Sequence, residues 1–118
     1  MRVVVLGASL KPVRYSFLAV NDLLDNGHDV LAIGNKKGKI RTVSIEDNPV
    51  SWDNVHTVTL YLSPENQKGY QDYIKKLTPQ RVIFNPGTEN PQFEKELNDL
   101  GIETLEACTL VMLRTHQF

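Results

Sequence analysis

The sequence predicts an α/β fold, a three-layer α/β/α sandwich in which helices cover both faces of a five-stranded parallel sheet. Short apolar runs of strand length alternate along the chain with segments whose apolar residues recur at helical spacing. A chain of 118 residues, 41% of them hydrophobic, is long enough for one buried core but short for two domains. We therefore expect a single domain over residues 1–118, with parallel strands joined by right-handed crossovers.

The first half of the chain contains two of the expected strands. Val3–Leu6 is a continuous apolar run, typical of a strand that is buried on both faces. Apolar residues then recur at helical spacing over residues 17–24, and Gly27 stands where a helix-ending glycine is expected. The second strand is expected over residues 29–33. Residues 40–54 show a mixed pattern, for which we expect one short helix or turn.

The second half contains two clear helix starts. Ser63-Pro64 and Asn90-Pro91 each combine a capping residue with proline at the first helical position. They follow the third strand, His56–Leu62, which alternates apolar and polar residues, and the fourth strand, Arg81–Phe84. A fifth strand is expected over residues 102–107 and a final helix over residues 108–113.

The unusual residues lie after the strands and not before them. A Rossmann-like strand order of 3-2-1-4-5 fits this pattern best, and in such a sheet ligands bind at the carboxyl ends of the strands, beside strand one. The candidate ligand-binding residues on that edge are Gly7, Ala8, Ser9, Lys11, Arg14, Asn35, Lys36, Tyr61, Asn85, Pro86 and Gly87.

The stretch GASLKPVRYS, residues 7–16, has the composition of a phosphate-binding loop. Gly7 permits a sharp turn and a close approach of the backbone to a ligand. The amides that follow and the start of the next helix favour an anion. Ser9 adds a hydrogen-bond donor, whereas Lys11 and Arg14 add formal charge.

The charge distribution also favours a small anionic ligand at the N-terminal half. Residues 1–41 hold seven of the 13 Lys and Arg residues but only three of the 14 acids. The net charge of −1 argues against a broadly basic nucleic-acid surface. Neither a membrane-spanning run nor a signal-peptide layout is visible, and Cys108 is the only cysteine, so we expect a cytoplasmic protein.

The loop departs from the usual dinucleotide fingerprint G-x-G-x-x-G. Ser9 and Pro12 replace its second and third glycines, and Gly34–Lys37 stand where an NAD-binding protein places an acid. Lysines at that position suit a ribose that carries its own phosphate. Two ligands meet this description: NADP, with a 2′-phosphate, and coenzyme A (CoA), with a 3′-phosphate.

Five segments together resemble the small single-domain CoA-binding proteins of bacteria, whose domain is similar to the CoA-binding part of the succinyl-CoA synthetase α subunit. The segments are GASLKPVRYS, NKKGKI, VTLYL, IFNPGTEN and GIETLEACTLVML. The resemblance implies that Gly7, Ala8, Ser9, Lys11 and Arg14 surround the diphosphate, with Lys36 near the adenosine. Many members have Asn-Pro where this chain has Gly34-Asn35.

No catalytic constellation is apparent in the sequence. Cys108 stands at the expected start of the last helix, where it is either a core residue or a thiol facing the ligand. Glu89 lies on the ligand edge, and Tyr15 and Tyr61 suit either adenine stacking or core packing. His28, His56 and His116 form no metal-binding spacing.

These observations favour a module that binds CoA or an acyl-CoA through its diphosphate and 3′-phosphate and performs no chemistry by itself. It would act as a carrier, a sensor or a partner of an acyl-CoA enzyme, and a homodimer is compatible with its edge strands. The alternatives are a small NADP-dependent oxidoreductase and a regulatory domain without a ligand. Nucleic acid, membrane and metal are not expected partners.

Overall fold

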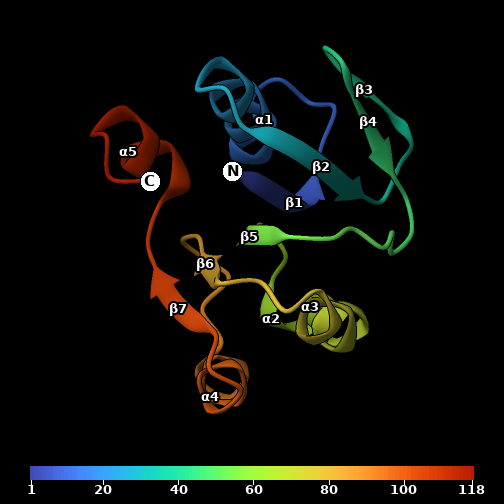
Figure 1. The fold of residues 1–118 in the computed structure, drawn as a ribbon. Helices are drawn as coiled ribbons and strands as arrows, with labels where there is room; N and C mark the ends of the chain where they lie inside the picture. The colour runs from blue at the N-terminus through green and yellow to red at the C-terminus, as the bar shows by residue number, and fades with distance from the viewer.

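A seven-stranded sheet crosses the centre of the molecule in the order β3-β4-β2-β1-β5-β6-β7 (Figure 1). The structure is a computed structural model that describes residues 1–118. The strands are β1 (Arg2–Ala8), β2 (Asp29–Gly34), β3 (Gly38–Ile40), β4 (Val43–Glu46), β5 (Val55–Leu60), β6 (Arg81–Phe84) and β7 (Glu103–Glu106). All neighbouring strands pair in parallel except β3 and β4, which are antiparallel.

Helices cover both faces of this sheet and form three layers. Figure 1 shows α1 (Tyr15–Asp25) and α5 (Thr109–Arg114) on one face. The other face carries α2 (Pro64–Gln67), the 3₁₀ turn η1 (Lys68–Tyr70), α3 (Gln71–Leu77) and α4 (Pro91–Asp99). The predicted α/β sandwich is therefore confirmed. No helix has the length and apolar character needed to cross a bilayer.

The core has two halves because successive side chains of a strand point to opposite faces. On β1, Val4 and Leu6 pack toward the face covered by α3 and α4, whereas Val3 and Val5 pack toward α1 and α5. All four side chains are fully buried. This burial on both faces explains why β1 is an uninterrupted apolar run. Because β1 is held in the core, the β1–α1 loop starts at the carboxyl end of the central strand.

The expected strand number and strand order were wrong. The expected short helix or turn within residues 40–54 is replaced by β4, which occupies the position beside β2, with β3 outside it. The third expected strand, here β5, consequently lies on the other side of β1. The β3–β4 hairpin is short, and it turns at Arg41, whose φ of +54° is unusual for a residue that is not glycine. Nothing in the local sequence indicates that conformation.

The predicted helix starts are confirmed in detail. The Ser63 hydroxyl accepts a hydrogen bond from the backbone N–H of Asn66, and Asn90 Oδ1 accepts one from the N–H of Phe93 at 3.2 Å. Pro64 and Pro91 occupy the first positions of α2 and α4. These two helices thus begin with capped N-termini, in contrast to α1.

Candidate functional site

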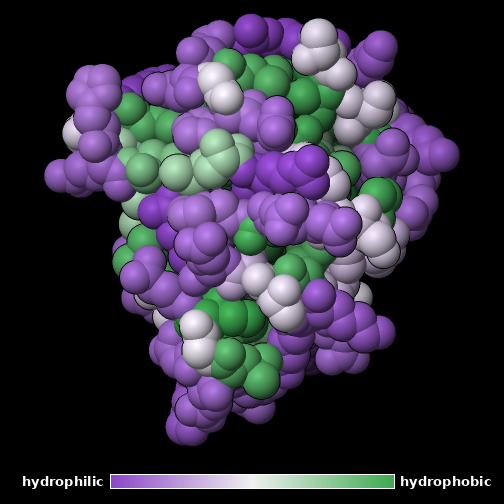
Figure 2. Space-filling view, in the orientation of Figure 1, coloured by the Kyte–Doolittle hydropathy of each residue, from purple (hydrophilic) through white to green (hydrophobic).

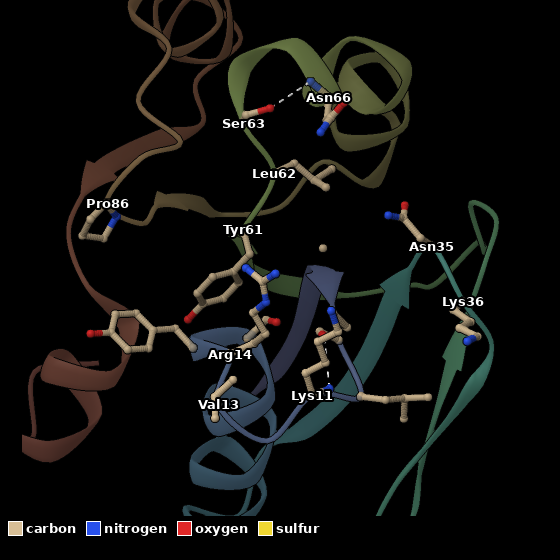
Figure 3. Close-up of a pocket in the computed structure, with 16 residues that line it drawn as sticks. Lys11, Val13, Arg14, Asn35, Lys36, Tyr61, Leu62, Ser63, Asn66 and Pro86 are labelled. Atoms are coloured by element: carbon tan, nitrogen blue, oxygen red, sulfur yellow. Dashed lines mark hydrogen bonds between the residues drawn. The ribbon is translucent and has the colours of Figure 1, made fainter.

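A cleft of about 840 Å³ opens at the carboxyl ends of the central strands (Figure 3). The β1–α1 loop forms one side, the β5–α2 segment forms the other, and the end of β2 closes the cleft near β3. The lining residues are Gly7, Ala8, Ser9, Leu10, Lys11, Val13, Arg14, Tyr15, Ser16, Asn35, Lys36, Tyr61, Leu62, Ser63, Asn66 and Pro86.

A β-bulge at Gly7 opens the floor of the cleft. The pairing of β1 with β2 shifts between Leu6 and Ala8, and Gly7 has a φ of +98°. A Cβ at Gly7 would lie 3.0 Å from the carbonyl carbon of Tyr61. A Cβ at Gly34, opposite the bulge, would lie 2.2 Å from the carbonyl oxygen of Ala8. The floor therefore requires both glycines, because backbone passes where side chains would stand.

The N-terminus of α1 faces this cleft without a cap. Arg14 occupies the capping position but makes no side-chain hydrogen bond to the helix, and no acidic residue stands in the first turn. The first amides of a helix have no partner within the helix, and the helix dipole gives this end about half a positive charge. Tyr15 and Ser16 of this turn line the cleft. An anion would satisfy these amides.

Three cations of the cleft, Lys11, Arg14 and Lys36, are exposed and lack acidic partners. The ion pairs of the molecule involve Arg41, Lys68, Lys75, Lys95 and Arg114, and none of these residues lines the cleft. The lining contains neither Asp nor Glu. Figure 3 shows Lys11 and Arg14 on the β1–α1 side and Lys36 near Asn35 at the far end. The site therefore carries uncompensated positive charge.

The wall across from this loop is formed by Leu62, Ser63 and Asn66, with Pro86 at the end opposite Lys36 (Figure 3). Val13 of the loop is 83% exposed, and Tyr15, the first residue of α1, is 62% exposed. The cleft thus combines cations on one side and at one end with apolar side chains at its rim, which suits a long ligand with a charged part and a less polar part.

Two of the predicted site residues, Asn85 and Gly87, do not line the cleft. Asn85 is buried, and its Nδ2 donates to Thr59 Oγ1 at 2.7 Å and to the Leu60 carbonyl at 2.9 Å. Its Oδ1 accepts from the N–H of Thr109 at 2.8 Å, so Asn85 fixes the start of α5. The N–H of Gly87 donates to Glu89 Oε1 at 2.8 Å. The structure brings the other predicted site residues together around the cleft.

Tyr61 has one side in the cleft and its hydroxyl in the interior. That hydroxyl is buried near the side chains of Thr59 and Thr109 and makes no hydrogen bond of good geometry with them. Burial raises the pKa of Tyr61 to about 12, so the side chain stays neutral at physiological pH.

Apart from Tyr15, six residues of the lining were not among the predicted site residues, and half of them are apolar. Leu10, Val13, Ser16, Leu62, Ser63 and Asn66 all line the cleft. Ser63 was expected on the ligand edge as a helix cap, and it does cap α2. Their single common signal is position, since each lies within a few residues of the carboxyl end of β1 or β5.

Other candidates lie outside the cleft lining. Cys108 is half-buried at the start of α5 and does not line the cleft. Glu89 is engaged with the Gly87 amide, as described above. No group of His, Cys, Asp and Glu side chains is arranged to hold a metal ion.

Comparison with known proteins identifies the family. A family model described as a CoA binding domain matches residues 1–114. The chain belongs to this CoA-binding domain family. No curated protein matches the chain. The family match covers all the residues that line the cleft.

Solved structures with the same fold are also known. The CoA-binding domain is similar to an uncharacterized protein known from a crystal structure, with 43% identity, a TM-score of 0.96, and coverage of 99% of this chain and 97% of that one. A Thermus thermophilus structure is 21% identical, with a TM-score of 0.85 and coverage of 99% and 90%. A hypothetical protein from Pyrococcus horikoshii OT3 is 24% identical, with a TM-score of 0.84 and coverage of 98% and 80%. The latter two share the fold.

Proposed function

We propose that this domain binds CoA or an acyl-CoA in the cleft, with the diphosphate against the β1–α1 loop. The observation that carries the proposal is the uncapped N-terminus of α1 beside cations that have no acidic partners. A diphosphate at this position would accept hydrogen bonds from the free amides and gain the favourable field of the helix. Membership of the CoA-binding domain family supports this ligand.

Within the cleft, Lys11 and Arg14 are the partners proposed for the diphosphate. Both come from the β1–α1 loop, which the bulge at Gly7 turns toward the cleft. The N–H of Lys11 donates to Ser9 Oγ at 3.1 Å, which leaves the Ser9 hydroxyl proton available to a ligand oxygen. Charge-assisted hydrogen bonds of this type contribute about 1.5–3 kcal/mol each.

The adenosine end is proposed to lie at Asn35 and Lys36, where Lys36 would pair with the 3′-phosphate. Gly34 ends β2 directly before these residues and keeps the backbone close to Ala8, so the segment begins at the floor of the cleft. The pantetheine arm would then run toward Pro86, at the other end of the cleft (Figure 3).

The proposed role is that of a carrier, a sensor or a partner module of an acyl-CoA enzyme. The cleft lining offers backbone N–H groups, side-chain hydroxyls, the side-chain amides of Asn35 and Asn66, and cations, which are groups that bind phosphate. It holds no histidine, cysteine or carboxylate that would serve as a general base or nucleophile toward the ligand.

Native mass spectrometry of gently purified protein tests this function. The expected result is a co-purified or added mass equal to CoA or an acyl-CoA, released when the protein unfolds. Retention of NADP with no binding of CoA would support the oxidoreductase alternative. If the folded protein retains no nucleotide and calorimetry detects no binding of added CoA, the proposed function is wrong.

A further inference from the structure

Gln67, at the end of α2, is a fully buried polar side chain beside the cleft. Its Nε2 donates to the carbonyl of Leu62 at 2.9 Å and to the carbonyl of Thr88 at 2.7 Å. Its Oε1 accepts from Asn90 Nδ2 at 3.0 Å. Both amide protons and the amide oxygen are therefore used within the protein.

These hydrogen bonds join two chain segments that are distant in sequence. Leu62 belongs to the wall of the cleft, which continues through Ser63 to Asn66. Thr88 and Asn90 belong to the β6–α4 loop, which also contributes Pro86 to the cleft. No backbone N–H donates to the carbonyls of Leu62 or Thr88. Gln67 is thus the donor that satisfies both carbonyls and holds the two segments together.

We propose that Gln67 is a positioning residue that fixes this wall and this loop in one arrangement and thereby sets the affinity for the pantetheine part of the ligand. The inference rests on the proposed function, which places the adenosine at Lys36. Figure 3 shows Pro86 at the end of the cleft remote from Lys36, and Leu62 and Ser63 across from the β1–α1 loop. The part of the ligand beyond the diphosphate therefore meets the segments that Gln67 joins.

The variant Gln67→Met keeps the length of the side chain but removes all three hydrogen bonds. It leaves the part-buried carbonyl of Leu62 and the buried carbonyl of Thr88 without donors, so the wall and the loop are expected to separate or to admit water. Gln67 makes no hydrogen bond to the β1–α1 loop or to Lys36. The diphosphate and adenosine sites are expected to remain intact.

Calorimetry with two ligands separates this role from general stability. CoA is expected to bind Gln67→Met about tenfold more weakly than the wild type. Adenosine 3′-phosphate 5′-diphosphate, which keeps both phosphates of the diphosphate but lacks the pantetheine arm, is expected to keep its Kd within about twofold. The control variant Gln92→Met, at an exposed position on α4, should change neither affinity. Equal losses for both ligands, or no loss for CoA, would overturn the proposal.

Amide hydrogen exchange gives a second measurement that needs no ligand. In Gln67→Met, exchange is expected to rise in residues 62–66 and 86–90 and to stay unchanged in α1. Wild-type protein that binds neither ligand would refute the proposed function and the pantetheine assignment, whereas the exchange result would still decide whether Gln67 joins the two segments. Unchanged exchange in both segments would refute that connection. If Gln67→Met does not fold, Asn90→Ser is measured in the same way, because it keeps a capping hydroxyl for α4 and removes the hydrogen bond to Gln67 Oε1.

Discussion

Arg14 and Lys36 are expected to serve different parts of the ligand. Replacing Arg14 with Ala removes a diphosphate partner and is expected to raise the Kd of CoA and of dephospho-CoA alike, by about ten- to hundredfold, since a hydrogen bond to a charged group contributes about 1.5–3 kcal/mol. Calorimetry with both ligands measures this. An unchanged Kd for both would remove Arg14 from the site.

Replacing Lys36 with Ala is expected to weaken CoA but not dephospho-CoA, which lacks the 3′-phosphate. The loss should be smaller, roughly three- to tenfold, because Lys36 would make a single ion pair screened by water, whereas Arg14 stands beside the free amides of α1. Lys76→Ala, at an exposed position on α3, is the matched control for the change in net charge. If wild-type protein binds the two ligands equally well, Lys36 does not hold the 3′-phosphate.

Gly34 is expected to tolerate no side chain. In Gly34→Ala the new Cβ would lie 2.2 Å from the Ala8 carbonyl oxygen, so β1 and β2 must move apart at a cost of about 1–3 kcal/mol or more. Gly69→Ala is the matched control, because nothing lies within 4 Å of its Cβ, and it should be neutral or slightly stabilising. Urea unfolding measures both. Equal stability of the two variants would contradict the close approach at the cleft floor.

At the scale of elements, α5 depends on the side chain of Asn85. The variant Asn85→Ala removes its hydrogen bonds to Thr59, Leu60 and Thr109 and leaves the first amide of α5 without an acceptor. We expect the free energy of unfolding to fall by about 2–4 kcal/mol. The Kd of CoA, measured well below the melting temperature, should change less than twofold. A tenfold loss of affinity in a folded variant would instead make Asn85 part of the binding site.

How much of the fold could be predicted differs between its elements. The starts of α2 and α4 could be predicted because a capping residue directly precedes a proline at each of them. The β3–β4 hairpin could not be predicted, because its strands are only three and four residues long. Its turn also requires a left-handed backbone conformation at Arg41, which the residue type does not indicate. The error in the expected strand order has the same cause, because β4 occupies the position beside β2 that was expected for the third strand.

The cleft residues that could be predicted from the sequence are those that carry charge or allow an unusual backbone, and not those that contribute only shape. Lys11 and Arg14 stand out in the sequence because cations after a buried strand have few structural uses. Leu62 and Asn66 carry no such signal. The role of Asn85 was hidden because a polar residue after a strand can serve a ligand or a neighbouring helix, and only the structure shows its partners on β5 and α5.

At the scale of the whole molecule, the edge of the sheet opposite the cleft is expected to make stability depend on pH. Burial lowers the pKa of His56 and of His28 below 6.5, and the charge of Arg81 lowers both further. Below pH 6.5 the unfolded chain therefore takes up protons that the folded protein resists. The free energy of unfolding should fall as the pH drops through this value.

Urea unfolding between pH 8 and pH 5 measures this effect. The variants His56→Gln and His28→Gln should each show a shallower decrease than the wild type over that range. Above pH 7.5, where both side chains are neutral in either state, the difference in stability between each variant and the wild type should stay constant. A wild-type stability that rises on acidification from pH 7 to pH 6 would contradict the lowered pKa values.

The histidines and the cleft lie at opposite ends of the strands. His28 and His56, at the amino ends, influence stability, whereas the cleft at the carboxyl ends carries the cations that have no acidic partners. Figure 2 shows that the face seen in Figure 1 is mostly hydrophilic, with apolar patches interrupted by hydrophilic side chains. The cleft combines exposed cations, the free backbone N–H groups at the start of α1 and enough space for a ligand.

The most direct test of the account is a crystal structure of the protein with CoA. The account predicts diphosphate density at the first turn of α1, within hydrogen-bond distance of the loop amides and of Arg14, with the adenosine toward Lys36. A CoA molecule bound elsewhere, or an empty cleft in crystals grown with saturating CoA, would contradict it.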